Sequence, residues 1–100
     1  MHAQMTTIQM DPDRIDGAVS QLEEQDLPTW KELDGFRGFT LFADRSSGKV
    51  FGVSYWDSKE HMDSAEEVVK DARRRAADAG GATDEPQVER FEVALDTFVR

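Results

Sequence analysis

The 100-residue sequence predicts an α+β domain of the ferredoxin-like type, a four-stranded antiparallel sheet with helices on one face. Three observations support this prediction. Four segments are rich in β-branched and aromatic residues or alternate in polarity, and two segments repeat apolar residues every three or four positions. The two kinds of segment follow one another in the order βαββαβ. Right-handed crossovers in this order place both helices on the same face of the sheet.

The first strand is predicted at residues 3–10, where Thr and Ile occur and no breaker precedes Asp11-Pro12. This pair also starts a helix, because Asp is a favoured N-cap and Pro needs no N–H at the first helical position. The apolar stripe of this helix continues to Leu33. Pro28 lies within the stripe and predicts a kink or a restart after Asp26.

Residues 36–44 and 49–56 are the next two strands, joined by Arg45-Ser46-Ser47-Gly48. Glycine at the end of this loop is typical of a hairpin closed by a bulge at a left-handed residue. In that register one face carries Phe39, Leu41, Ala43, Phe51, Val53 and Tyr55, and the other carries Gly38, Thr40, Phe42, Val50, Gly52, Ser54 and Trp56. Neither set has the polarity of a water-facing antiparallel sheet.

A second helix is predicted after the hairpin. Asp57 and Glu60 have the spacing of an N-cap and its N3 partner, and mostly small apolar residues recur on one face as far as Gly80-Gly81. Residues 88–95 alternate in polarity and form the last strand. Residues 1–100 are expected to be a single domain, because this length suits one hydrophobic core.

Helices can cover only one of the two apolar faces of the predicted sheet. Several large apolar side chains left exposed in one patch would each forgo about 1.5 to 3 kcal/mol of burial, and the patch would favour association. A symmetric homodimer, sheet against sheet, resolves this conflict. The alternative is that edge strands or the chain ends wrap over the second face.

Composition restricts the classes of function. Asp plus Glu outnumber Lys plus Arg by 21 to 12, and the net charge of −9 argues against nucleic acid as a partner. The sequence has no cysteine, which excludes disulfides, thiolate catalysis and cysteine-bound metal. It also has no HExxH or glycine-rich phosphate motif, so no metal or nucleotide is expected. It has neither an apolar run long enough to span a membrane nor a signal-peptide pattern, so a cytoplasmic location without membrane contact is expected.

Short motifs add a family resemblance. Gly35-Phe36-Arg37-Gly38 before the hairpin and Val53-Ser54-Tyr55-Trp56-Asp57-Ser58 at its end resemble the antibiotic biosynthesis monooxygenase domains of the dimeric α/β barrel superfamily. Residues 4–96 fit the order and spacing of that family. The resemblance implies a homodimer whose sheets face each other. It also implies that Trp56 faces a cleft between sheet and helices, which assigns Phe42, Thr40 and Ser54 to the same side.

The expected binding site is therefore a cleft with Trp56 and Phe42 as walls and the hydroxyls of Thr40 and Ser54 between them, suited to a small aromatic molecule. A cleft filled by the alanine-rich second helix is the alternative. Family members that need no cofactor oxidise aromatic polyketides with O₂ and use an Asn and a Trp. No Asn occurs in the sequence, so Thr40, Ser54 or Gln4 would have to replace that amide.

The other chemical groups offer fewer possibilities. The haem-degrading branch of the resembled family needs an axial His late in the second helix, whereas His61 lies in its first turn, so haem ligation and other cofactors are not expected. His61 and Arg73-Arg74-Arg75 are expected to be solvated, and Tyr55 to pack on the dimer side. Two functions remain open, a cofactor-independent monooxygenase and a non-catalytic ligand-binding or accessory homodimer, besides a purely structural dimerisation module.

Overall fold

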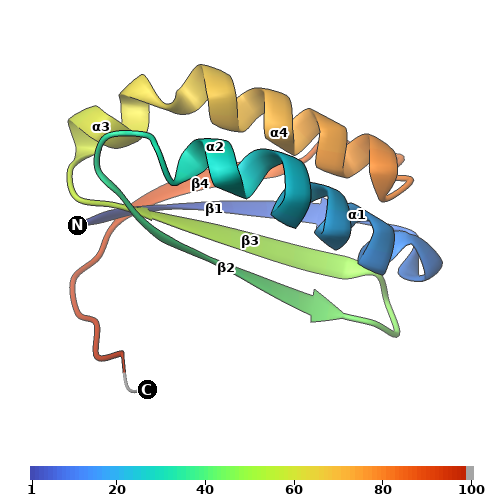
Figure 1. The fold of residues 1–100 in the computed structure, drawn as a ribbon. Helices are drawn as coiled ribbons and strands as arrows, with labels where there is room; N and C mark the ends of the chain where they lie inside the picture. Colours follow the sequence, from blue (N-terminus) through green and yellow to red (C-terminus); the bar gives the residue numbers. More distant parts are fainter. Residues whose placement is uncertain (99–100) are drawn as a thin grey trace.

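A computed structural model describes residues 1–98 of the chain. Its elements are β1 (His2–Gln9), η1 (Pro12–Arg14), α1 (Ile15–Gln21), η2 (Leu22–Asp26), α2 (Leu27–Trp30), β2 (Phe36–Asp44), β3 (Lys49–Trp56), α3 (Lys59–Ser64), α4 (Glu66–Ala79) and β4 (Gln87–Glu92). Within these described residues the strands form one four-stranded antiparallel sheet, in the order β2-β3-β1-β4. The helices lie together on one face of this sheet (Figure 1). The predicted ferredoxin-like fold is confirmed.

The first helical segment begins and is interrupted where the sequence predicts. The Asp11 carboxylate accepts a hydrogen bond from the N–H of Asp13, and Pro12 occupies the first position of η1. The interruption is the π-helical turn η2, which lies directly before Leu27-Pro28. Leu27 keeps right-handed helical dihedral angles, so the wider turn accommodates Pro28 without the extended break that proline usually imposes.

The second helical segment begins one residue later than predicted. Ser58, which has extended dihedral angles, is the N-cap of α3, and its hydroxyl accepts a hydrogen bond from the N–H of His61. The carboxylate of Asp57 instead contacts the His61 ring nitrogen Nδ1 at 2.6 Å. The prediction of Asp57 as N-cap is therefore wrong. The last strand, β4, also ends earlier than predicted, at Glu92.

The hairpin differs from the prediction by one residue. The loop Arg45–Gly48 has the predicted bounds, but Asp44 pairs with Lys49, which is one residue away from the register that the predicted bulge requires. Gly48 is left-handed as predicted, with φ +85°, and its N–H donates to the carbonyl oxygen of Asp44 over 2.8 Å. The carboxylate of Asp44 accepts hydrogen bonds from the N–H and the hydroxyl of Ser46. These bonds stabilise the loop.

A shift of one residue moves every side chain of a strand to the opposite face relative to its partner. Phe39 and Leu41 consequently pair with Ser54 and Gly52, and all four line the space beneath the helices. Thr40 and Phe42 pair with Val53 and Phe51 on the other face. The prediction that Thr40 and Phe42 lie beneath the helices with Ser54 and Trp56 is therefore wrong.

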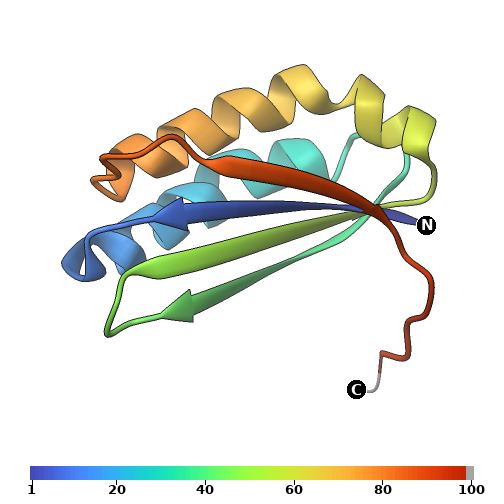
Figure 2. The ribbon, with the colours of Figure 1, turned by 180° about the vertical axis from the view of Figure 1, so that it is seen from behind.

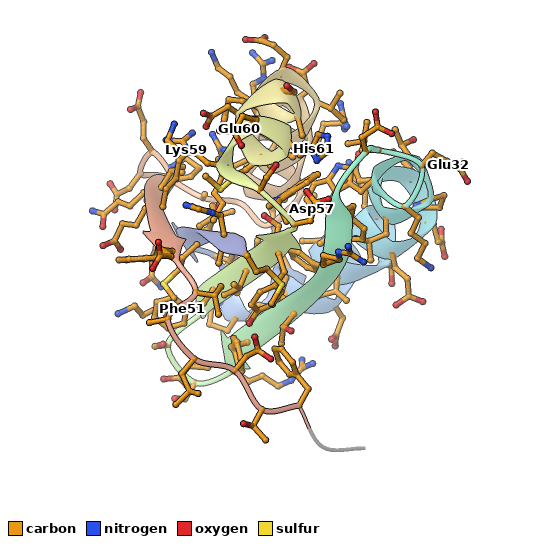
Figure 3. All side chains as sticks on the ribbon, turned by 90° about the vertical axis from the view of Figure 1, so that its left-hand side faces the viewer. Glu32, Phe51, Asp57, Lys59, Glu60 and His61 are labelled. Atoms are coloured by element: carbon orange, nitrogen blue, oxygen red, sulfur yellow. The ribbon has the colours of Figure 1, made fainter. Side chains whose placement is uncertain are left out.

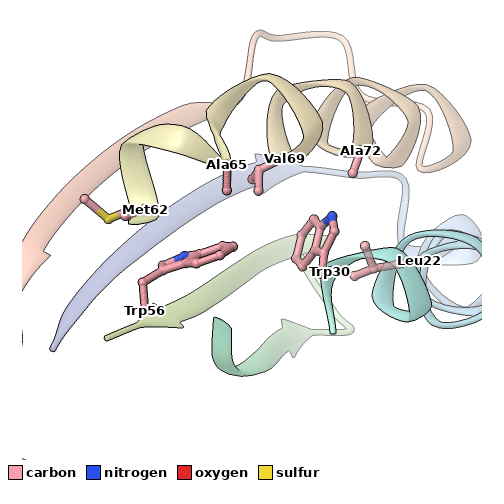
Figure 4. Close-up of a cluster of buried hydrophobic side chains, with 7 residues drawn as sticks. All are labelled: Leu22, Trp30, Trp56, Met62, Ala65, Val69 and Ala72. Carbon is pink, nitrogen blue, oxygen red and sulfur yellow. The ribbon is translucent and has the colours of Figure 1, made fainter. Parts of the chain in front are cut away.

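The core lies between the helices and the sheet. One cluster of buried side chains contains Leu22, Trp30, Trp56, Met62, Ala65, Val69 and Ala72 (Figure 4). A second cluster contains Ile8, Met10, Ile15, Ala18, Val50 and Ala77. Edge-to-face aromatic contacts join the sheet to the helices, with Trp30 and Phe39 centroids 5.4 Å apart. The small residues of α4 let this helix approach the sheet closely.

The opposite face of the sheet is partly covered: Val53 is 7% exposed, whereas Phe42 and Phe91 are about half exposed. Phe51, Val53 and Tyr55 of β3 point to this face, and Phe51 lies on the side away from the helices in Figure 3. The chain after β4 leaves the sheet on this side (Figure 2), and the ring of Phe98 packs against Tyr55 with centroids 5.8 Å apart. Phe42 nevertheless remains 53% exposed. The chain end thus covers only one end of the face.

None of the helices within residues 1–98 is long and apolar enough to cross a membrane.

Candidate functional site

A small cleft lies between the helices and the covered face of the sheet. Its volume is about 50 Å³. The sheet contributes Gln4, Thr6, Ile8, Phe39, Leu41, Val50, Gly52 and Ser54, the helices contribute Leu22, Trp30, Val69, Ala72, Arg73 and Ala76, and Met10 follows directly after β1. A cleft is therefore present between the sheet and the helices, as predicted. It is small, but α4 does not fill it. Drug-sized sites typically have about 300–1,000 Å³.

The tryptophan that lines this cleft is Trp30. Trp56 is only 1% exposed and packs among the core side chains beside α3. Its indole N–H donates to the Ser54 hydroxyl oxygen over 3.0 Å. Trp56 thus supports the site from below through Ser54, which does line the cleft. The four predicted site residues are separated: Ser54 is at the cleft, Trp56 is behind it, and Thr40 and Phe42 are across the sheet.

Three nitrogen atoms at the cleft are buried and have no hydrogen-bond partner among the described residues. They are Nε2 of Gln4, Nε1 of Trp30 and Nε of Arg73. The Gln4 and Trp30 side chains come from residues that are only 3% and 4% exposed. In Figure 4 the indole nitrogen of Trp30 is directed toward α4 near Ala72. A buried donor without a partner costs about 1–3 kcal/mol, so such a group in a native protein requires a physical explanation.

Arg73 belongs to a charge cluster at the edge of the cleft. Its guanidinium Nη2 donates to Glu66 over 2.9 Å, and Arg90 of β4 contacts the other oxygen of the same carboxylate. Burial alone would raise the pKa of the Glu66 carboxyl, but the hydrogen bonds from Arg73 and Arg90 outweigh it and hold this pKa below its usual value. Two guanidinium groups therefore share one ionised carboxylate, and the charge of Arg90 also contributes to lowering the pKa of Asp63.

His61 lies outside the cleft. It sits in the first turn of α3, beside Asp57 at one end of the sheet (Figure 3), and its side chain is 42% exposed. The hydrogen bond to Asp57 raises the pKa of His61, and the same bond lowers the pKa of Asp57. Among residues 1–98 no group of three or more His, Asp or Glu side chains could hold a metal ion.

Sequence reasoning named Gln4 as a substitute amide but missed Trp30 and Arg73 as site residues. Trp30 lies within the apolar stripe that is predicted to continue to Leu33, and it does join the core. Arg73 was assigned to a solvated arginine run, yet its side chain is 13% exposed. The available signal was spacing: Arg73 follows Val69 by four positions and precedes Ala76 by three, which places it on the buried stripe.

Known proteins resemble this chain in two ways, in sequence and in structure. No protein-family model matches the sequence. Two uncharacterized proteins of Mycobacterium tuberculosis are similar in sequence: Rv2557 is 34% identical over 94 residues, and Rv2558 is 34% identical over 97 residues. These alignments cover 94% and 95% of the chain but only 41% and 39% of the relatives. The chain therefore spans about two fifths of the length of the curated relatives it matches.

Solved structures show the fold. A monooxygenase from the ActVA-Orf6 gene of Streptomyces coelicolor, in complex with nanaomycin D, is 16% identical with a TM-score of 0.79, covering 99% of this chain and 92% of that one. The haem degrader MhuD of M. tuberculosis, with two haems bound in its active site, is 21% identical with a TM-score of 0.73, covering 98% and 100%.

A third structure, described as a putative antibiotic biosynthesis monooxygenase from Deinococcus radiodurans, is 17% identical with a TM-score of 0.72, covering 100% and 99% of the two chains. The resemblance that the sequence motifs indicate is confirmed at the level of the fold. The chain has the ferredoxin-like fold of the antibiotic biosynthesis monooxygenase proteins.

Proposed function

We propose that this chain is a monooxygenase-like domain that binds a small aromatic molecule in the cleft beneath its helices and acts as a homodimer. The observation that carries the proposal is the combination of apolar walls and unpartnered buried donors at one place, between Trp30 and Gln4. Apolar walls with a few polar groups that fix orientation are typical of small-molecule sites. Structures of the same fold hold nanaomycin D or haem.

We propose that the oxidation uses no bound cofactor and depends on residues at the cleft. Donors such as the Gln4 amide stabilise negative charge that develops on an oxygen of the substrate. Gln4 thereby takes the role of the Asn that members of the resembled family use. Trp30 supplies an aromatic wall and a second N–H.

A non-catalytic ligand-binding homodimer is the second candidate, and one observation favours it. Among the described residues lining the cleft, Arg73 is the titratable group, and a guanidinium cannot act as a general base at neutral pH. Proton removal from a bound phenol or anthrone would then depend on water. A domain with these residues binds a ligand without turning it over unless the ligand ionises by itself.

Oxygen consumption with an anthrone separates the two candidates. We expect turnover above the rate without protein, and a loss of about 100-fold in kcat in Gln4→Met, the scale of removing one donor to a developing oxyanion. Gln25→Met is the matched control, because Gln25 is exposed on η2 and does not line the cleft. Circular dichroism of each variant checks that the fold is retained.

The outcomes are distinct. Anthrone binding by calorimetry without oxygen consumption supports the non-catalytic binder. Neither binding nor turnover, with both proteins folded, contradicts the proposed function.

A further inference from the structure

We infer that the cleft selects an aromatic molecule bearing an ionised oxygen group, a carboxylate or a phenolate, and that Gln4, Trp30 and Arg73 recognise that group. The inference rests on the proposed binding function and adds the chemical class of the ligand. It follows from the kind of polar atom that is left unpartnered at the cleft, from the surrounding charge and from the walls.

The unpartnered atoms are all donors. An indole Nε1 and a guanidinium Nε carry a hydrogen and cannot accept one, and an amide Nε2 carries two hydrogens. The group that satisfies them is one that accepts hydrogen bonds and donates none. Carboxylates, phenolates and carbonyl oxygens have this character, whereas a neutral alcohol or amine would bring a hydrogen that also requires an acceptor; hydrogen bonds to the charged groups are the stronger ones.

The cleft offers few acceptors for such a hydrogen. The hydroxyl of Ser54 already accepts from Trp56, and Thr6 is the other hydroxyl that lines the space. The Gln4 amide adds one carbonyl oxygen, and apart from Arg73 the remaining walls are aliphatic or aromatic. Water could fill about 50 Å³ as a few molecules, but buried water needs two to four polar partners each. A molecule with an apolar body and an acceptor-only edge matches the walls and the donors together.

The local charge also favours a negatively charged ligand. The chain carries a net charge of −9, yet the charged residue that lines the cleft is Arg73, which shares the carboxylate of Glu66 with Arg90. The Arg73 side chain is 13% exposed, and charges in such a position are screened less than at the surface. An anion at the donors would complete this cluster.

The size of the cleft sets a further requirement. About 50 Å³ accommodates the oxygen-bearing group, whereas an aromatic ring requires side chains to move. Met10 lines the cleft, and methionine adapts readily because it is unbranched. Leu22 lies at the π-helical turn η2, a structure that often occurs at functional sites.

Calorimetry with matched probes tests the inference. The probes are 2-naphthoate, its neutral amide 2-naphthamide, the cation 2-naphthylmethylammonium, and 4-nitrophenol on either side of its own ionisation. We expect 2-naphthoate and the nitrophenolate to bind at least about tenfold more tightly than the neutral or cationic probes, since a hydrogen bond to a charged group contributes about 1.5–3 kcal/mol. If 2-naphthoate binds and the nitrophenolate does not, the site selects a carboxylate. If only the nitrophenolate binds, the site selects a phenolate.

Substitutions assign the effect to residues. Arg73→Met, Gln4→Met and Trp30→Phe are each expected to reduce the preference for 2-naphthoate over 2-naphthamide by about tenfold. Arg74→Met is the matched control, since Arg74 has the same charge, pairs with Asp71 on the surface and does not line the cleft. It should leave the preference unchanged. Arg73→Lys keeps the charge and removes Nε, and it is expected to retain part of the preference.

Two results would overturn the inference. Equal binding of 2-naphthoate and 2-naphthamide refutes selection of an oxyanion while leaving the proposed aromatic site intact. An anion preference that Arg74→Met reduces as much as Arg73→Met shows general charge attraction rather than recognition at the cleft. Absence of binding by every probe, with the protein folded, contradicts the proposed function itself.

Discussion

The two tryptophans show how a single hydrogen bond separates a core residue from a site residue. Both are buried, but the indole N–H of Trp56 donates to Ser54, whereas that of Trp30 has no partner within the described residues. Satisfied buried donors are the rule in native proteins. An unsatisfied one beside a cleft therefore indicates a place for a ligand or water.

At the residue scale, the Asp57–His61 contact predicts a pH dependence of stability. The hydrogen bond to Asp57 raises the pKa of His61 above 6.5, so the folded state binds the imidazole proton more tightly than the unfolded state. This contribution to the free energy of unfolding is complete below pH 6.5 and is lost as pH rises through the folded pKa. Urea unfolding of the wild type should therefore show decreasing stability above about pH 6.5.

Asp57, the partner of His61, sets the low-pH end of the range in which the pair stabilises the folded state. The pKa of Asp57 lies below its ordinary 3.8, chiefly because of the same hydrogen bond, so its contribution is present above that value and is lost as pH falls through the folded pKa. His61→Gln and Asp57→Asn should each remove the added pH dependence near neutrality. A wild-type stability curve parallel to that of His61→Gln from about pH 5.5 to 8 would show that the pair is not coupled in solution.

At the element scale, the conformation of the hairpin loop depends on Gly48. Its φ of +85° is costly for any residue with a Cβ, and a Cβ there would overlap the carbonyl oxygen of Met10. Gly48→Ala should therefore lower the free energy of unfolding by about 2 kcal/mol or more, measured by urea denaturation. The left-handed glycine was predictable from the sequence. The pairing of Asp44 with Lys49 was not, because it depends on hydrogen bonds of the Asp44 side chain and main chain.

Gly17 is the matched control for this prediction. It lies inside α1, it is exposed, and a Cβ there would meet open space. Gly17→Ala should raise stability by about 0.5–1 kcal/mol, because alanine is the better helix former. Equal effects of the two substitutions would show that the loop does not adopt the observed conformation.

At the scale of the whole molecule, the apolar face opposite the helices predicts self-association. Phe42 and Phe91 are about half exposed there, and a second copy with the same face would cover them. Phe42→Lys should weaken dimerisation at least about a hundredfold in light scattering or sedimentation, because the symmetric pair loses two buried rings. Phe42→Leu should retain the dimer.

The control for charge is Ser20→Lys, which makes the same change in net charge at an exposed position on α1. It should dimerise like the wild type. A monomeric wild type at micromolar concentration would contradict the homodimer, and the chain end that packs Phe98 on Tyr55 would then be the only cover observed among the described residues.

By itself the sequence determined the order of the elements, their approximate bounds and the presence of two apolar sheet faces, because local periodicity and turn residues encode these features. The tertiary structure decided which residues meet. A shift of one residue in the pairing of the two hairpin strands placed Thr40 and Phe42 across the sheet from the cleft. Helix packing brought Trp30 and Arg73 to Gln4 across long stretches of sequence. Periodicity assigns a residue to a face, but register and packing determine its neighbours there.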